Sequence, residues 1–301
     1  MIPAETIVIA GPTGAGKTDL SLRLAERLGG EIVGADAFQI YSGLPILTAQ
    51  PPRSELMRVR HHLVGSVDPA ESYDAARYVR EAREALCAVA ARGKRPIVVG
   101  GTGLYIKSLL VGLDDLPGQD PVLREEFSHL ALPLLVERLS AVDPEGAADI
   151  DCANRLRVER ALEIVLLTGK RLSEVRKGSR PMPRGVRGVL LVRERAELRD
   201  RITANVAAMF ERGVEREVAA LPEERTGPTA SMTLGLREIR SMLRGELSRE
   251  AAQESLITAT HRYAKRQMTW FRNQHDFPEL DAGRFPDADA TAEELLRLLT
   301  V

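Results

Sequence analysis

One segment near the amino terminus, Gly11–Thr18 with the sequence GPTGAGKT, restricts the fold more than any other part of the chain. It fits the pattern G-x-x-x-x-G-K-[S/T], which binds phosphates when it lies between a strand and a helix. The flanking residues supply that context, because Thr6–Ala10 is an apolar run and Asp19–Leu28 has the apolar spacing of an amphipathic helix. We therefore predict a phosphate-binding loop.

Each part of this loop contributes to holding a di- or triphosphate. Glycines allow the backbone amides to point at the phosphates, and the start of the helix adds the positive end of its dipole. Lys17 supplies a cation and Thr18 offers a hydroxyl to Mg²⁺. The pattern does not identify the ester or the leaving group. The predicted phosphate-binding residues are Gly11, Pro12, Thr13, Gly14, Ala15, Gly16, Lys17 and Thr18.

Length and composition exclude several classes of protein. The 301 residues suffice for one large domain with an insertion, or for two domains. The chain has no run of about 18 apolar residues, which is the length needed to span a bilayer, and no signal-peptide pattern opens it. Two cysteines are too few for a disulfide framework or a zinc site. We expect a cytoplasmic protein without a membrane segment, and a monomer, since no feature indicates an obligate dimer.

Charge is unevenly distributed although the net charge is only −1. Residues 155–187 hold ten Lys or Arg against three Glu, and residues 261–272 hold four Lys or Arg and no acid. Such concentration suits a polyphosphate backbone such as that of a nucleic acid. The alternative is a pair of solvated helix faces that bind nothing.

Two further predicted strands end in residues suited to a ligand site. The apolar run Glu31–Ala35 is followed by Asp36, and Pro96–Val99 is followed by the glycine-rich segment Gly100–Tyr105. The carboxyl ends of parallel strands form the ligand-binding edge of a sheet, so Asp36 should face the phosphate loop as a candidate base. The alternative is a helix-capping or loop aspartate.

The order of these elements predicts an α/β fold, a doubly wound parallel sheet of the P-loop NTPase type with a helical insertion domain. A helix capped by Ser72 should run to Ala91, and Val189–Val192 should return to the sheet. We expect a core of residues 1–117 and about 186–301, which includes C-terminal helices, and an insertion over about 118–185. His61 and His62 lack a third ligand at metal-site spacing, so we assign no metal to them.

A phosphate loop with Asp36 fits two reaction types. In a small-molecule kinase, Asp36 would accept a hydroxyl proton while ATP donates its terminal phosphoryl group. In the other type, the loop would hold a diphosphate as the leaving group, and the organic group attached to it would be transferred.

Motifs along nearly the whole chain resemble those of the tRNA dimethylallyltransferase (isopentenyltransferase) family. They are GPTGAGKT at Gly11–Thr18, ADAFQIYSGL at Ala35–Leu44, TAQP at Thr48–Pro51, HHL at His61–Leu63, GGTGLY at Gly100–Tyr105, DP at Asp120–Pro121, NRLRVERALEIVLLTGK at Asn154–Lys170 and RYAKRQMTWFR at Arg262–Arg272. A phosphate loop alone would be unspecific, whereas this set in this order is specific.

The resemblance implies a donor, an acceptor and roles for the catalytic residues. Dimethylallyl diphosphate would bind the loop with Mg²⁺ as cofactor, and its five-carbon group would pass to the exocyclic amine of the adenosine 3′ to the anticodon. Lys17 and Thr18 would stabilise the departing diphosphate, with Arg201 close to it. Asp36 would act as general base, and Thr102 would lie near the amine and the diphosphate.

The resemblance also implies that the partner is a tRNA anticodon stem-loop, whose target adenine leaves the stack to reach Asp36, and that the insertion faces the tRNA. Trp270 has two alternatives, stacking on a base or packing in a helical core. The residues that match tRNA-contacting positions are Asp36, Ala37, Phe38, Gln39, Thr102, Arg124, Arg157, Arg160, Lys265, Arg266, Gln267, Trp270 and Arg272.

The chain departs from the family pattern at a few positions. Ala37 stands where the family usually has Ser, Leu47 and Gln50 stand where it has the Gly and Lys of G-T-A-K-P, and Asn205 replaces an Arg. Loss of a buried, paired group of this kind would weaken binding by about 1–3 kcal/mol. The alternatives to tRNA prenylation are prenyl transfer to free adenine nucleotides and a P-loop kinase; the basic segments favour tRNA.

Overall fold

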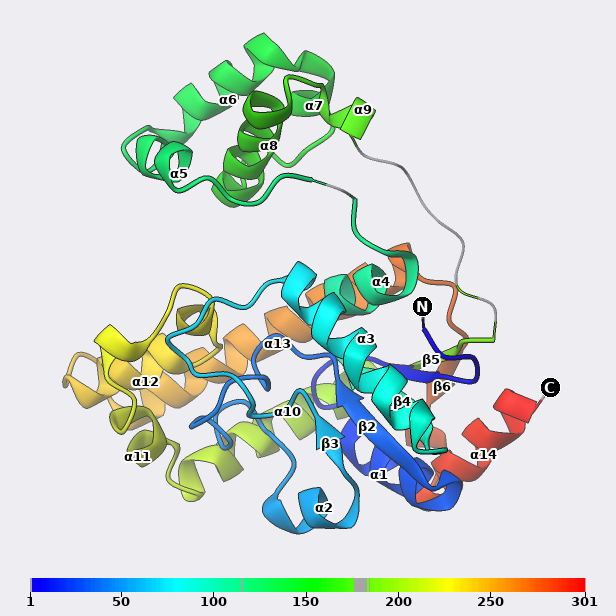
Figure 1. Cartoon of the computed structure of the whole chain (residues 1–301). Helices are drawn as coiled ribbons and strands as arrows, with labels where there is room; N and C mark the ends of the chain where they lie inside the picture. Colours follow the sequence, from blue (N-terminus) through cyan, green and yellow to red (C-terminus); the bar gives the residue numbers. More distant parts are fainter. Residues whose placement is uncertain (1, 115, 176–182, 184, 301) are drawn as a thin grey trace. The chain divides into compact units, whose positions relative to one another are not determined.

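The computed structural model describes residues 2–114, 116–175, 183 and 185–300 (Figure 1). The chain forms two compact units, one made of Met1–Leu110 and Met182–Val301 and the other of Val111–Pro181. The division expected at 117/118 and about 185/186 differs from this one by a few residues at each boundary. Each unit has its own core, and each is described by itself.

The larger unit is built on a six-stranded sheet of order β3-β2-β4-β1-β5-β6, in which every neighbouring pair is parallel. The expected α/β fold with a parallel sheet is therefore confirmed. In register, Ile9 lies between Val99 and Val189. The strands are β1 (Ile7–Ala10), β2 (Gly30–Gly34), β3 (His61–His62), β4 (Arg95–Gly100), β5 (Arg187–Val192) and β6 (Glu279–Asp281).

Alternate residues of the central strands form the main core. Ile7 and Ile9 of β1, with Val189 and Leu191 of β5, pack with α1 (Lys17–Leu28) and α14 (Ala288–Thr300). This arrangement follows from the two-residue repeat of a strand, which directs every second side chain to the same face. None of the described helices is both long and apolar enough to cross a bilayer.

The helix α3 (Ala75–Ala91) packs on β2 and β4, and its start corrects the sequence-based expectation. The predicted cap, Ser72, is wrong. Asp74 caps the helix instead, because its carboxylate accepts a hydrogen bond of 2.8 Å from the Arg77 amide. Ser72 precedes the buried Tyr73 and lies outside the helix.

The paired histidines form the short edge strand β3 and act as hydrogen-bonding residues. His61 Nδ1 lies 2.8 Å from the Val59 carbonyl, and His62 Nε2 lies 2.7 Å from a carboxylate oxygen of Glu31. Arg92 also donates to Glu31, and these hydrogen bonds, led by that of Arg92, lower the pKa of Glu31 to about 2. The strand is thereby tied to the sheet and to the end of α3.

A second core lies beside the sheet, where helices that follow β5 pack on the loop after β2. Phe210 and Val206 of α10 meet Leu44 and Leu47 of that loop. The helices of this unit that remain to be placed are α2 (Arg53–Arg58), α4 (Gly103–Val111), α10 (Arg195–Glu211), α11 (Val214–Ala219), α12 (Leu236–Leu243) and α13 (Arg249–Gln274), with short 3₁₀ turns at Glu223–Arg225, Ala230–Met232 and Ala282–Arg284.

All of the secondary-structure elements described in the smaller unit are helices, and the unit has an independent core. Phe127, Leu135, Leu139, Val158 and Leu162 are buried in it. Its helices are α5 (Pro121–Ser128), α6 (Leu132–Val142), α7 (Pro144–Ala148), α8 (Arg155–Thr168) and α9 (Leu172–Val175).

Candidate active site

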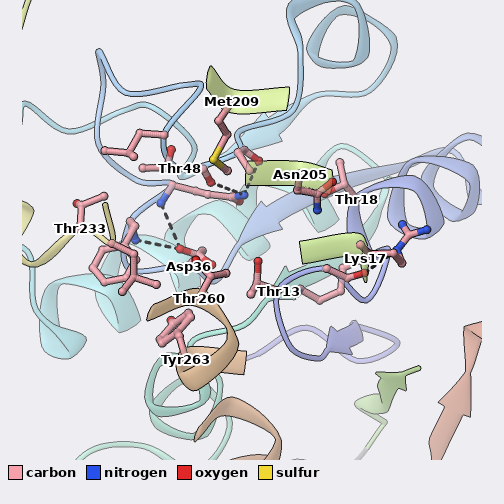
Figure 2. A pocket seen from close by; sticks show the side chains of 18 of the residues that line it. Thr13, Lys17, Thr18, Asp36, Thr48, Asn205, Met209, Thr233, Thr260 and Tyr263 are labelled. Carbon is pink, nitrogen blue, oxygen red and sulfur yellow. Dashed lines mark hydrogen bonds between the residues drawn. The ribbon is translucent and has the colours of Figure 1, made fainter. Parts of the chain in front are cut away.

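A cavity of about 270 Å³ lies where the phosphate loop, the end of β2 and the helices α10 and α13 meet (Figure 2). In this view Lys17 and Thr18 lie toward one end and Asp36 toward the other, with Thr13 between them. The cavity thus joins a phosphate site to a carboxylate. Its apolar lining residues are Phe38, Leu47, Ala49, Val99, Met209, Leu234 and Leu256.

The phosphate loop has the conformation that its glycines allow. A Cβ on Gly11 would lie 2.5 Å from the Leu191 carbonyl oxygen, and Gly16 has a φ of 96°. Within the loop, Lys17 Nζ donates a 2.7 Å hydrogen bond to the Pro12 carbonyl. Burial lowers the pKa of Lys17 to about 8, against an opposing effect of Asp36. A bound anion would therefore gain a poorly solvated cation as its partner.

Two arginines brace the loop from β5 and α10. Arg201, which the resemblance puts close to the diphosphate, donates from its Nε to the Gly14 carbonyl at 2.9 Å. Arg193 Nε donates to the Ala15 carbonyl at 3.0 Å and also pairs with Glu197. Sequence reasoning missed Arg193, although its position directly after a strand is the same signal that identified Asp36.

Gln267 joins the phosphate loop to the glycine-rich corner after β4. Its Oε1 accepts from the Thr13 amide and its Nε2 donates to the Gly101 carbonyl, both at 2.9 Å. The side chain is buried, and a Cβ on Gly101 would lie 2.3 Å from that Nε2. Its contacts are thus with two loops of the site, whereas the sequence suggested a contact with tRNA.

Asp36 is held in place by the backbone that follows it. Its Oδ1 accepts from the amides of Phe38 at 2.9 Å and Gln39 at 3.2 Å, whereas Oδ2 has no hydrogen-bond partner among the described residues. Thr102 Oγ1 accepts from the Ala37 amide at 2.9 Å, which brings Thr102 beside Asp36. The backbone of residue 37 makes this contact, so the alanine side chain does not alter it.

Tyr263 also lines the cavity, and sequence reasoning missed it as a site residue (Figure 2). Its ring centroid lies 6.1 Å from that of Phe38. Burial, followed by the charge of Asp36, raises the pKa of Tyr263, so its hydroxyl stays protonated. The available signal was its spacing of four residues from Gln267, which places both side chains on one face of α13.

The wall formed by residues 44–50 is fixed by hydrogen bonds from side chains. Gln39 Nε2 donates to the carbonyls of Ala49 at 2.8 Å and Thr48 at 3.2 Å. Gln50 Nε2 donates to the carbonyls of Gln39 at 2.9 Å and Tyr41 at 2.8 Å. Gln50, where the family usually has a lysine, therefore holds the backbone of residues 39 and 41 through hydrogen bonds.

Glu217 of α11 anchors the same wall from outside the cavity. Its two carboxylate oxygens accept from the amides of Ile46 and Leu47, each at 2.7 Å. Burial raises the pKa of Glu217, although the two hydrogen bonds act to lower it. Leu47 is itself buried among α10, α12 and α13, where a glycine would leave a gap.

The other predicted tRNA-contacting residues of the larger unit lie on or near the surface of α13. Lys265 and Arg266 are exposed, and Arg272 is exposed but pairs with Glu279 at 2.8 Å. Trp270 is half-buried against Gly103, where a Cβ would lie 2.0 Å from its ring. Of the two alternatives for Trp270, packing accounts for these contacts.

In the smaller unit, two of the three predicted arginines are engaged within the unit. Arg124 and Arg160 both pair with Glu163, at 3.0 and 2.6 Å, and the Glu163 side chain is fully buried. Burial alone would raise the pKa of Glu163, but hydrogen bonds from these arginines lower it. Arg157 is exposed and makes no side-chain ion pair among the described residues.

Comparison with known proteins agrees with this geometry. The family model described as IPP transferase matches residues 39–274, and one described as Isopentenyl transferase matches residues 4–68. The tRNA dimethylallyltransferase of Akkermansia muciniphila is 43% identical over 297 residues, which cover 98% of this chain and 99% of that protein. The tRNA dimethylallyltransferase 1 of Citrifermentans bemidjiense is 43% identical over 291 residues, 95% of this chain and 94% of that protein.

Solved structures give the same result at the level of the fold. The full-length tRNA isopentenylpyrophosphate transferase of Bacillus halodurans matches with a TM-score of 0.72 and 33% identity, covering 99% of this chain and 96% of that chain. A eukaryotic dimethylallyltransferase acting on tRNA matches with a TM-score of 0.84 and 29% identity, covering 98% of this chain and 78% of that chain. The family-model match, the near full-length relatives and the fold together show that this chain belongs to the IPP transferase family.

Proposed function

We propose that this protein transfers the dimethylallyl group of dimethylallyl diphosphate to the exocyclic amine of an adenosine in tRNA and releases diphosphate. The observation that carries the proposal is the cavity in which Lys17 and Thr18 face the same space as Asp36. A phosphate site and a carboxylate in one cavity suit a reaction in which a diphosphate leaves while an amine loses a proton. The relatives named tRNA dimethylallyltransferase support this choice of donor and acceptor.

The donor half of the site would stabilise the departing charge. The amides of the phosphate loop and Lys17 would bind the diphosphate, and Arg193 and Arg201 hold the loop in shape. Thr18 lines the cavity, and its hydroxyl would hold Mg²⁺ there. When bound, Mg²⁺ would neutralise part of the charge on the diphosphate.

The acceptor half would handle the amine. As the bond between the allylic carbon and the diphosphate oxygen breaks, a bond forms from that carbon to the adenine nitrogen, and a proton of the amine passes to Asp36. Oδ2 is the oxygen available for this proton, because Oδ1 already accepts two amides. Tyr263, which lines the cavity, and Thr102, which accepts from the amide that follows Asp36, would orient the base beside that carboxylate.

The acceptor that we propose is the adenosine 3′ to the anticodon, flipped out of its stack into the cavity. The resemblance of the motifs supports this position in the tRNA. Among the residues first predicted to contact tRNA, Arg157, Lys265 and Arg266 are the cations that are exposed and without a side-chain ion pair in the described part of the chain.

The test is to incubate the protein with Mg²⁺, labelled dimethylallyl diphosphate and unmodified tRNA, and to analyse the nucleosides by mass spectrometry. We expect dimethylallyl-adenosine at the position 3′ to the anticodon. Parallel reactions with free AMP as acceptor, and with ATP labelled in its terminal phosphate as donor, should give no product. Prenylated AMP without prenylated tRNA, or phosphate transfer from ATP, would contradict the proposal.

A further inference from the structure

Part of the lining of the reaction cavity belongs to the second core, where the loop after β2 packs on helices that follow β5. Leu47 and Leu256 are buried members of that core, and Met209 and Leu234 pack against it; all four line the cavity. We propose that Leu47, together with Leu256, closes this apolar part of the cavity and thereby restricts the donor to a five-carbon chain. The inference rests on the proposed function and names a residue that selects its donor.

The two helices that line the cavity run antiparallel. Arg249, at the start of α13, donates a 3.0 Å hydrogen bond to the carbonyl of Phe210, near the end of α10. Farther along the pair, His261 Nε2 of α13 lies 3.2 Å from the Arg199 carbonyl, near the start of α10. The end of α10 therefore lies beside the start of α13, and the lining residues of the two helices can be compared along one axis.

Along this axis the lining changes from polar to apolar. Arg201 of α10 and Gln267 of α13 are both hydrogen-bonded to the phosphate loop. Met209 of α10 and Leu256 of α13 line the cavity at the other end of the pair. Arg201 and Met209 are eight residues apart, which corresponds to about 12 Å along the helix. The organic group of a diphosphate held by the loop thus has its apolar surroundings at this second end.

The apolar end is closed by packed side chains. A Cβ on Gly235 would lie 2.8 Å from a Leu256 methyl and 3.1 Å from a Leu47 methyl, so the two leucines fill the space in front of this glycine. Leu47 is 5% exposed and Leu256 is 2% exposed. Because Glu217 accepts from the Leu47 amide at 2.7 Å, the backbone at Leu47 is fixed as well. A longer chain could enter only by displacing a packed side chain.

The length limit is assigned to Leu47 rather than to Met209. Met209 is half-buried, and an unbranched thioether side chain can change its shape to fit a ligand. Leu47 is branched, buried and held by its backbone, so it cannot make room in the same way. Since the family usually has glycine at this position, the leucine barrier is a feature of this chain.

The test compares the same truncation at two leucines of one loop. Leu47→Ala shortens a side chain that lines the cavity, whereas Leu44→Ala shortens one that is also buried in the second core but is not among the lining residues. The Kd of each protein is measured for inorganic diphosphate, for dimethylallyl diphosphate and for its ten-carbon homologue geranyl diphosphate, with Mg²⁺ and without tRNA. Inorganic diphosphate reports on the phosphate site alone.

We expect the wild type and Leu44→Ala to bind dimethylallyl diphosphate at least tenfold more tightly than geranyl diphosphate. Leu47→Ala should bind geranyl diphosphate at least tenfold more tightly than the wild type does, and the Kd for inorganic diphosphate should stay within about twofold in all three proteins. With tRNA as acceptor, the ratio of kcat/KM for the two donors should shift in the same direction. Thermal unfolding checks folding, and Leu47→Val with Leu44→Val replaces the alanine pair if either alanine variant is unfolded.

An unchanged donor preference in Leu47→Ala would overturn the inference, and so would an equal shift in Leu47→Ala and Leu44→Ala. A wild type that binds both prenyl diphosphates equally would also overturn it. A failure of the proposed function gives a different result, in which the wild type binds dimethylallyl diphosphate but forms no prenylated tRNA. The Kd values, which need no reaction, then still decide whether Leu47 selects the donor.

Discussion

Lys17 is the residue whose chemistry depends most on its surroundings, because burial lowers its pKa from 10.5 to about 8. Below pH 8 the side chain of the free protein is charged, and above pH 8 it loses its proton. A bound diphosphate favours the charged form. The affinity for dimethylallyl diphosphate should therefore be constant near pH 7 and should fall about tenfold per pH unit above 8.

Calorimetric titration with dimethylallyl diphosphate in the absence of tRNA measures this effect. Lys17→Arg is the matched control, because a guanidinium stays charged throughout the range and the ionisation of the ligand is common to both proteins. The loss above pH 8 should be seen with Lys17 and not with the arginine variant. Identical pH profiles would show that titration of Lys17 does not control binding.

At the scale of an element, Glu217 holds the wall of the cavity through the amides of Ile46 and Leu47. Glu217→Gln leaves one acceptor oxygen for two amides, which should cost about 1–3 kcal/mol of stability. Because Gln39 links this wall to the backbone after Asp36, kcat should fall about tenfold while the Kd for diphosphate stays unchanged.

Hydrogen exchange of residues 44–50, measured together with kcat, tests this role of Glu217. Glu215→Gln is the control, since Glu215 pairs with Arg249 and has no hydrogen bond to the wall. Hydrogen exchange of residues 44–50 and kcat should both change in Glu217→Gln, and neither should change in Glu215→Gln. Faster exchange with an unchanged kcat would mean that the wall does not position the reacting groups.

Sequence patterns predicted those strands and loops that are specified by residues adjacent to one another in the chain. The strand–loop–helix around Lys17 and the strand before Asp36 were predicted because apolar runs and a phosphate-loop pattern are contiguous in the sequence. The edge strands β3 and β6 have two and three residues, which is too short to show a strand repeat. Glu217 was missed because its partners lie about 170 residues away, whereas Arg193, which directly follows a strand, carried a local signal that could have identified it.

At the scale of the whole molecule, the chain has separate cores in its two units. Glu163 is one of the buried acidic residues of the smaller unit, with Asp143 and Glu159, and it pairs with Arg124 and Arg160. Glu163→Gln should destabilise that unit by about 3 kcal/mol. This is near the low end of the cost of breaking a buried ion pair, because both arginines remain partly exposed. The affinity for dimethylallyl diphosphate should not change, since the phosphate site is built within the larger unit.

Thermal unfolding and diphosphate titration of Glu163→Gln test this separation. Glu125→Gln, which alters an exposed pair with His129 in the same unit, is the control and should change the stability by less than about 0.5 kcal/mol. A loss of diphosphate affinity in Glu163→Gln would show that the phosphate site depends on the charge network of the smaller unit.

The proposed reaction depends on Asp36 as a base, and single-turnover prenylation of tRNA by Asp36→Asn tests this most directly. Asparagine keeps an oxygen for the amides of Phe38 and Gln39 but cannot take up the proton of the amine. With both substrates saturating, we expect dimethylallyl-adenosine to form at least 100-fold more slowly than in the wild type, with the Kd for tRNA within about threefold. Formation at the wild-type rate would contradict the assignment of Asp36 as the base.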